Sequence, residues 1–283
     1  LYFIVRSPIS LRNSLSFQSK NSILNFYNSN IPNQKWESID EVKKIIEKIP
    51  YKNEVNSIWS INPYTKMKRT IFNGEGTCAN LSFGFAIYSS MLKRDVSIIS
   101  IFDKDKWFKG IGHMLVLMEL RNNGNITLDL RQGGFPMLKN SYLDFENLLN
   151  KEKKVYQFLS INKKDNWFVK NGHPRNRLDP IFKNNLSTSY YITIMMNDEI
   201  NKYHSILQNL NSYINLPESK IKKIIFDTFI LLTDNYPKNY VNSSDLKIIK
   251  STFPFLFFMA YMWKYSIWVV ILSAITLLFK KII

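Results

Sequence analysis

Three side chains in the sequence have the types and the order that thiol chemistry requires. Cys78 is the only cysteine among 283 residues, and His113 and Asp129 follow it along the chain. A thiol becomes a nucleophile when a neighbouring imidazole or a helix N-terminus stabilises its thiolate. A cysteine, a histidine and a carboxylate supply a nucleophile, a general base and a group that orients the base. The sequence therefore predicts a Cys-His-Asp centre.

The segment around Cys78 predicts a tight turn that leads into a helix. Gly74 and Gly76 precede the cysteine, and apolar residues at helical spacing follow it as far as Leu92. Glycine allows the sharp turn that such an entry requires. Cys78 then lies in the first helical turn, where unpaired N–H groups and the helix dipole favour a negative charge.

His113 and Asp129 lie on a predicted β-hairpin made of residues 113–120 and 126–130. A two-residue Asn-Gly turn would place the two side chains on opposite faces of the ribbon. A three-residue loop at 121–123 pairs Leu120 with Gly124 and places Asp129 diagonal to His113 on one face. We therefore expect an odd-length loop or a bulge. Gly112 lets the backbone beside His113 approach another element.

Three stretches of residues 73–134 resemble one known family. They are "GEGTCANLSFGFAIYSSMLKRDVSIIS", "GHMLVLMEL" and "ITLDLRQGG". They resemble the transglutaminase-like domain of the papain-type cysteine enzymes. The resemblance implies that Cys78 is the nucleophile, His113 the base and Asp129 its orienting partner. It implies acyl transfer through a thioester, by hydrolysis of an amide or peptide bond or by transfer to an amine. It requires no cofactor, and its substrates are peptides, proteins or amides.

Two alternatives to this assignment remain open. Arylamine N-acetyltransferases have the same Cys-His-Asp order. Their Arg-Gly-Gly-x-Cys motif is absent, because Gly74-Glu75-Gly76-Thr77 precedes Cys78 here. A catalytically inactive, membrane-anchored binding scaffold is the other alternative. For the enzyme, the Cys78 N–H is one natural oxyanion donor, and Trp59 or Asn62 is the predicted second donor.

The order of elements predicts an α+β fold with a helix packed on a small antiparallel sheet, as in papain-like and transglutaminase-like cores. A helix is predicted from Ser38, which forms a capping box with Glu41, to Pro50. The expected organisation is a loosely structured lead-in at 1–35, a transglutaminase-like domain at 36–195, a helical segment at 196–250 and a C-terminal anchor at 253–279.

Residues 253–279 are long and apolar enough to span a bilayer as one helix. Lys264 is the single charged residue among them. The sequence therefore predicts a single-pass protein with a C-terminal transmembrane anchor. Lysines precede and follow the segment in similar number, so the side of the membrane that the rest of the chain faces stays open.

The composition excludes several other functions. The formal charge of +16 is scattered along the chain, which indicates a solvated basic surface rather than a nucleic-acid site. His173 and His204 have no companion ligands at metal spacing, so both are assigned to structure. No phosphate-binding loop or dinucleotide motif is present. We expect no metal, no cofactor and no nucleic-acid partner.

Overall fold

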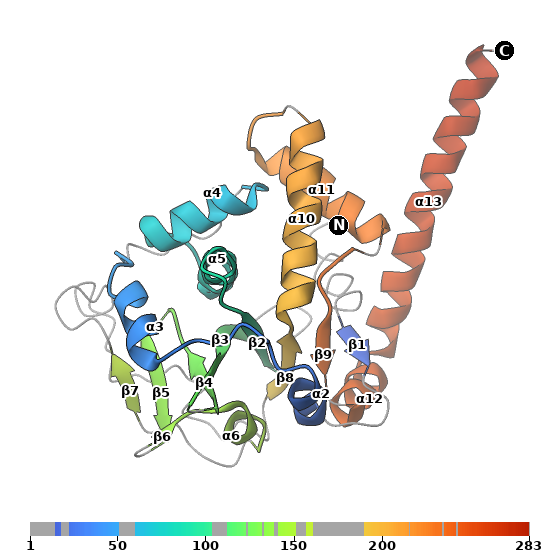
Figure 1. Cartoon of the computed structure of the whole chain (residues 1–283). Helices are drawn as coiled ribbons and strands as arrows, with labels where there is room; N and C mark the ends of the chain where they lie inside the picture. The colour runs from blue at the N-terminus through green and yellow to red at the C-terminus, as the bar shows by residue number, and fades with distance from the viewer. Residues whose placement is uncertain are drawn as a thin grey trace, which may run out of the picture.

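The fold is organised around a sheet of six strands within the described residues (Figure 1). Their order is β1-β9-β8-β2-β3-β4, with the β1–β9 pair parallel and the other pairs antiparallel. The bounds are β1 Leu15–Phe17, β2 Val96–Asp103, β3 Gly112–Leu120, β4 Gly124–Leu128, β8 Tyr190–Met195 and β9 Asn239–Val241. Helices cover this sheet, which confirms the predicted α+β class.

The structure is a computed structural model that describes most of the chain. The described residues are 15–17, 23–50, 60–103, 112–122, 124–131, 133–138, 141–150, 157–160, 190–214, 216–233, 235–241 and 243–282. Trp59, His173 and most of the loop before Gly112 lie outside them.

A smaller sheet lies beside β4. Its order is β6-β5-β7, with the bounds β5 Gly134–Leu138, β6 Ser141–Tyr142 and β7 Gln157–Ser160. An isolated bridge between Asp129 and Gly134 connects the end of the large sheet to the start of the small one. The chain therefore turns sharply just after β4, next to one of the predicted catalytic residues.

Helix α5, Cys78–Met91, packs on β2 and β3 in the middle of the large sheet (Figure 1). It buries apolar side chains such as Leu81, Phe85 and Ala86 against the strands. On its other side run α4, Pro63–Met67, and the π-helix η1, Lys68–Phe72. A Cβ atom at Gly84 would overlap Oγ1 of Thr70, so glycine allows η1 to lie close against α5.

The remaining helices surround this centre. Their bounds are α2 Ile23–Ser29, α3 Ile39–Ile46, α6 Phe145–Asn150, α10 Asn197–Tyr213, α11 Lys220–Leu232, α12 Ser243–Thr252 and α13 Pro254–Ile282. Ser38 caps α3 by accepting a hydrogen bond from the Glu41 N–H group at 3.3 Å, which is one half of the predicted capping box; the Glu41 carboxylate accepts from the Glu37 N–H group instead, at 2.9 Å. The α-helix ends at Ile46, before the predicted stop at Pro50, but Ile49 is still fully buried.

Segments outside 36–195 also contribute to the large sheet. β1 comes from the predicted lead-in, and β9 comes from the predicted helical segment. In α2, Tyr27 is buried and donates a hydrogen bond to Oε2 of Glu119 at 2.9 Å. The three segments therefore share one sheet and its core.

Helix α13 runs away from the sheet beyond α12 (Figure 1). Large apolar side chains along it are exposed, among them Phe255, Val270 and Leu277. Among the described residues, no helix has both the length and the apolar character that crossing a membrane requires. The C-terminal membrane anchor stays a prediction.

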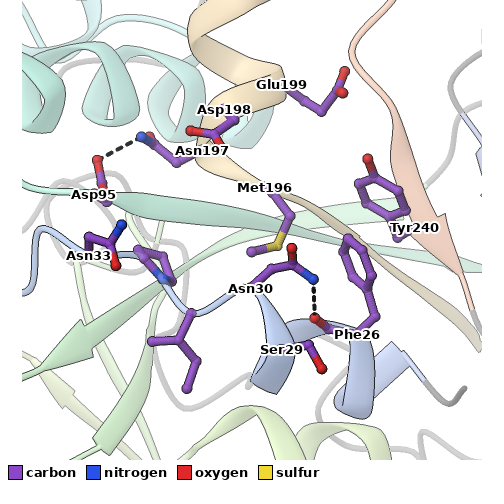
Figure 2. A pocket seen from close by; sticks show the side chains of 12 residues that line it. Phe26, Ser29, Asn30, Asn33, Asp95, Met196, Asn197, Asp198, Glu199 and Tyr240 are labelled. Carbon is purple, nitrogen blue, oxygen red and sulfur yellow. Dashed lines mark hydrogen bonds between the residues drawn. The ribbon is translucent and has the colours of Figure 1, made fainter.

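A cavity of about 420 Å³ opens between α2 and the start of α10 (Figure 2). Three carboxylates line it, those of Asp95, Asp198 and Glu199. Asp95 accepts a hydrogen bond from Nδ2 of Asn197 at 2.7 Å and directly precedes β2. His113 pairs with Ile101 near the other end of β2, so this cavity is remote from the predicted thiol centre.

Candidate active site

Cys78 occupies the first position of α5, as the sequence predicts. Gly74 and Gly76 have φ values of 66° and 117°, in the region that favours glycine, and they provide the predicted turn. Thr77 is the N-cap, and its N–H group donates to Oδ1 of Asn80 at 3.2 Å. The thiol therefore lies beside the unpaired N–H groups of a helix N-terminus, which favour the thiolate.

Glu75 holds the turn before Cys78 in place. Its carboxylate lies 2.7 Å from Nη2 of Arg69, and its N–H group donates to the Arg69 carbonyl at 3.0 Å. Arg69 belongs to η1, which packs on α5. The position of the cysteine is thus fixed from both the side chain and the backbone of Glu75.

The β3–β4 hairpin has the predicted register. Leu120 pairs with Gly124 and Val116 pairs with Leu128, which corresponds to a three-residue loop. Asp129 directly follows β4 and lies on the same face as His113. At Gly112, a Cβ atom would overlap the carbonyl of Ile101, so the predicted close approach beside His113 is also confirmed.

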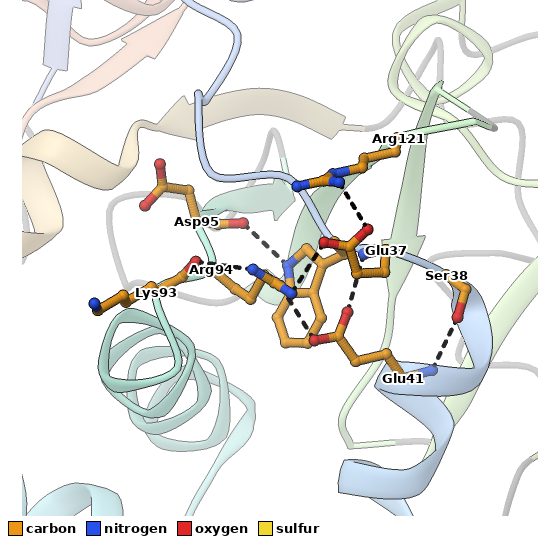
Figure 3. Close-up of polar contacts among 8 residues, drawn as sticks. Glu37, Ser38, Glu41, Lys93, Arg94, Asp95 and Arg121 are labelled. Atoms are coloured by element: carbon orange, nitrogen blue, oxygen red, sulfur yellow. Dashed lines mark hydrogen bonds and ion pairs between the residues drawn. The ribbon is translucent and has the colours of Figure 1, made fainter.

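A network of charged side chains fastens this hairpin to the N-terminal segment (Figure 3). Glu37 lies 3.1 Å from Nη1 of Arg121, at the hairpin turn, and 3.3 Å from Nη2 of Arg94, after α5. Arg94 also contacts Glu41 in α3 at 3.1 Å. The Trp36 N–H group donates to the Glu119 carbonyl at 2.9 Å. The helix that carries Cys78 and the hairpin that carries His113 are therefore held by the same segment.

His113 and Asp129 form a buried pair. Nε2 of His113 lies 2.8 Å from Oδ2 of Asp129, and both side chains are inaccessible to solvent. Two backbone hydrogen bonds between Asp129 and Gly134, at 2.9 and 3.1 Å, hold the main chain of Asp129 in place. Because Nε2 faces Asp129, Nδ1 is the ring nitrogen that remains for the thiol.

The Cys78 thiol lies close enough to the His113 ring for each group to shift the pKa of the other. Burial raises the pKa of Cys78, but the hydrogen bond and charge of His113, the Met114 backbone N–H and the charge of Arg131 together lower it below its ordinary value. Burial lowers the pKa of His113, but the charge and hydrogen bond of Asp129 outweigh it and hold this pKa well above its ordinary value. Both shifts favour a thiolate next to an imidazolium.

The three side chains differ in exposure. Cys78 is half-buried, whereas the side chains of His113 and Asp129 are fully shielded. The His113–Asp129 pair is therefore protected from water. Shielding strengthens the interaction between the two charged groups.

Of the two predicted second oxyanion donors, Trp59 lies outside the described residues, and the Asn62 side chain is engaged at the start of α4. Oδ1 of Asn62 accepts hydrogen bonds from the N–H groups of Tyr64 and Thr65 at 2.9 and 3.3 Å, so this side chain caps α4. The next residue, Pro63, lines a cavity together with Ser90 near the end of α5. Ser90 is separated from Cys78 by about 18 Å of helical rise.

Two further groups at the site were not predicted as functional. The Met114 backbone N–H group and the positive charge of Arg131 both lower the pKa of Cys78. Arg131 comes two residues after Asp129, where the chain turns towards the small sheet. Its closeness to Asp129 in the sequence is the feature from which its place at the site could have been predicted. Met114 acts through its backbone, which no residue type reveals.

Comparisons with protein-family models, curated proteins and solved structures give no match to this chain. Within the described residues, no three His, Cys, Asp or Glu side chains are grouped so that they could hold a metal ion.

Proposed function

We propose that the chain is a thiol enzyme that transfers an acyl group from an amide or peptide through a thioester on Cys78. The observation that carries this proposal is the position of His113, which lies 2.8 Å from the buried Asp129 carboxylate and lowers the pKa of the nearby Cys78 thiol. His113 favours the thiolate form of Cys78, and Asp129 favours the imidazolium form of His113. The proposed architecture is similar to that of transglutaminase-like, papain-type enzymes.

In the first step, the Cys78 thiolate attacks the carbonyl carbon of the substrate and forms a C–S bond. The carbonyl electron pair moves onto oxygen, which gives a tetrahedral oxyanion. The N–H groups at the start of α5 are the nearest donors for this oxyanion, and the positive charge of Arg131 favours it.

In the second step, the oxyanion collapses and the C–N bond of the substrate breaks. The His113 imidazolium donates its proton to the departing amine, which leaves a thioester and a neutral imidazole. Asp129 keeps the ring oriented and stabilises its protonated form. A water molecule or a second amine, activated by His113, then attacks the thioester and regenerates the thiolate.

The proposal is tested by trapping the acyl-enzyme. The full chain is mixed with p-nitrophenyl acetate at neutral pH, and the Cys78 peptide is examined by mass spectrometry. We expect one acetyl group on Cys78 and a burst of p-nitrophenol equal to the amount of protein. Cys78 is the only cysteine, so Cys78→Ala should abolish the burst. No acetylation of Cys78 would contradict the proposal.

Two further reagents separate the proposal from its alternatives. Acetylation by acetyl-CoA, with transfer to an arylamine, would indicate an arylamine N-acetyltransferase. A Cys78 that reacts with p-nitrophenyl acetate no faster than a cysteine peptide would indicate an inactive scaffold. His204→Phe is a matched control for His113→Phe, since both remove a buried imidazole but only His113 contacts the thiol.

A further inference from the structure

A second cavity, of about 340 Å³, lies where α4, α5 and α10 meet. Pro63 and Ile87 are buried in its wall, and Tyr64 and Met91 are exposed at 44% and 56%. The cavity therefore has an apolar interior that is open to solvent on one side. Ligand sites in proteins commonly combine such a wall with a few polar groups.

His204, from α10, lines this cavity in an unusual state. The residue is only 8% exposed, and neither Nδ1 nor Nε2 has a hydrogen-bond partner in the described part of the chain. Its ring packs against the rings of Phe83 and Tyr203, with centroids 6.0 and 5.8 Å away. Buried polar atoms are nearly always satisfied, so two unsatisfied nitrogens on one side chain indicate a missing partner.

The imidazole of His204 is neutral at physiological pH. Burial, and then the positive charge of Lys66, lower the pKa of His204 from 6.5 to about 3. A neutral imidazole has one N–H donor and one nitrogen acceptor. A ligand at His204 therefore has to offer hydrogen-bonding groups without relying on an opposite charge.

The other polar side chains that line the cavity are also uncharged. They are Tyr64, Ser90, Asn201, Ser205 and Gln208. Hydroxyl and carboxamide groups both donate and accept hydrogen bonds. We propose that this cavity is a binding site for a small, uncharged carboxamide whose apolar part packs against Ile87 and whose amide group bonds His204.

The cavity is distinct from the thiol centre. Ser90 and Cys78 lie at opposite ends of α5, separated by about 18 Å of helical rise. The two sites share one helix but no lining residue. Binding at His204 therefore does not depend on whether Cys78 forms a thioester.

The test is a titration of the full chain, labelled with ¹⁵N-histidine, with isobutyramide. Nitrogen NMR reports hydrogen bonding at each imidazole, and the His204 signals are assigned by their loss in His204→Phe. We expect saturable shifts of the His204 nitrogens at millimolar ligand, as suits a molecule with few atoms. Isobutyrate and isobutylammonium, with the same apolar body and a charge, should bind at least about fivefold more weakly.

Three variants complete the test. His204→Phe keeps a ring against Phe83 and should weaken isobutyramide binding roughly five- to tenfold, whereas His204→Gln keeps a donor and an acceptor and should retain most of it. Ser90→Leu leaves His204 intact but fills the cavity, so it should block isobutyramide binding. It therefore tests the site even if the His204 variants fail to fold. Absence of saturable shifts in the unmodified chain, or tighter binding of isobutyrate than of isobutyramide, would overturn the proposal.

Discussion

Two histidines in the described part of the chain are buried to a similar extent, but their pKa values are shifted in opposite directions. His113 is 2% exposed and His204 is 8% exposed. His113 lies 2.8 Å from the Asp129 carboxylate, and its pKa is well above the ordinary value. His204 has no hydrogen-bond partner among the described residues, and its pKa falls to about 3. Burial alone therefore does not determine the charge of either ring.

The difference follows from which neighbours each element brings to the ring. The β3–β4 hairpin and the turn after it place a carboxylate against His113, and the start of α5 places a thiol there. The helices around His204 supply two aromatic rings and the charge of Lys66. The first environment is suited to proton transfer, and the second to recognition of an uncharged group.

The largest expected effect comes from His113→Phe. This change leaves the Asp129 carboxylate buried without its partner, which costs about 3–5 kcal/mol for a broken buried pair. We expect that loss in the free energy of unfolding, measured by urea denaturation at neutral pH. The double variant His113→Phe, Asp129→Leu removes both charges and should recover much of it. An unchanged stability in His113→Phe would contradict the buried ion pair.

A smaller effect is expected from Gly112→Ala, which tests how the backbone positions His113. The new Cβ atom would overlap the Ile101 carbonyl, and the resulting shift of the strand should cost about 1–3 kcal/mol. Gly124→Ala is the control, because it meets no atom and carries only the cost of a φ of +68°, about 1 kcal/mol. Equal losses in urea denaturation would show that β2 and β3 are not in close contact at Gly112.

The pH dependence of stability should separate the two histidines. The raised pKa of His113 gives stability that is fully present below about pH 6.5 and is lost as the pH rises through the folded-state value. The lowered pKa of His204 gives the opposite sign, since stability is lost as the pH falls from 6.5 towards about 3. Melting temperatures across this range should therefore fall less on acidification in His204→Phe than in the unmodified chain. If the melting temperature falls equally on acidification in His204→Phe and in the unmodified chain, His204 is not buried in its neutral form.

The smallest effect is expected from His204→Phe at neutral pH. It removes two unsatisfied nitrogens while keeping a ring of similar size against Phe83. Stability should stay unchanged or rise by about 1 kcal/mol in the same urea assay, because replacing unsatisfied polar groups by an apolar one is neutral or favourable. A loss as large as that of His113→Phe would mean that His204 has a polar partner.

The thiol centre was largely predictable because its parts follow from local rules. Glycines at 74 and 76 indicated the entry into α5, and contact between His113 and Asp129 required the three-residue hairpin loop that the structure has. These features depend on turn geometry and on the two-residue period of strands. The catalytic role itself stays a prediction.

Other features depend on tertiary packing and left no local signal. β1 and β9 have three residues each, which is too few for a recognisable strand pattern. They lie far apart in the sequence and pair only in the folded sheet. Asn62 was expected near Cys78, but the direction of α4 places it near the other end of α5. The absence of a partner for His204 is decided by which helices surround it, so its residue type could not reveal the cavity.

The rate at which iodoacetamide alkylates Cys78, measured as a function of pH, tests the central claim most directly. The unmodified chain should reach half of its maximal rate below about pH 8.5, the ordinary pKa of a free thiol, because His113 lowers the pKa of Cys78. His113→Phe should shift the midpoint of this rate–pH curve to higher pH, whereas His204→Phe should leave the midpoint unchanged. If the midpoint measured for the unmodified chain equals the pKa of a free thiol, the proposed thiolate–imidazolium pair is contradicted.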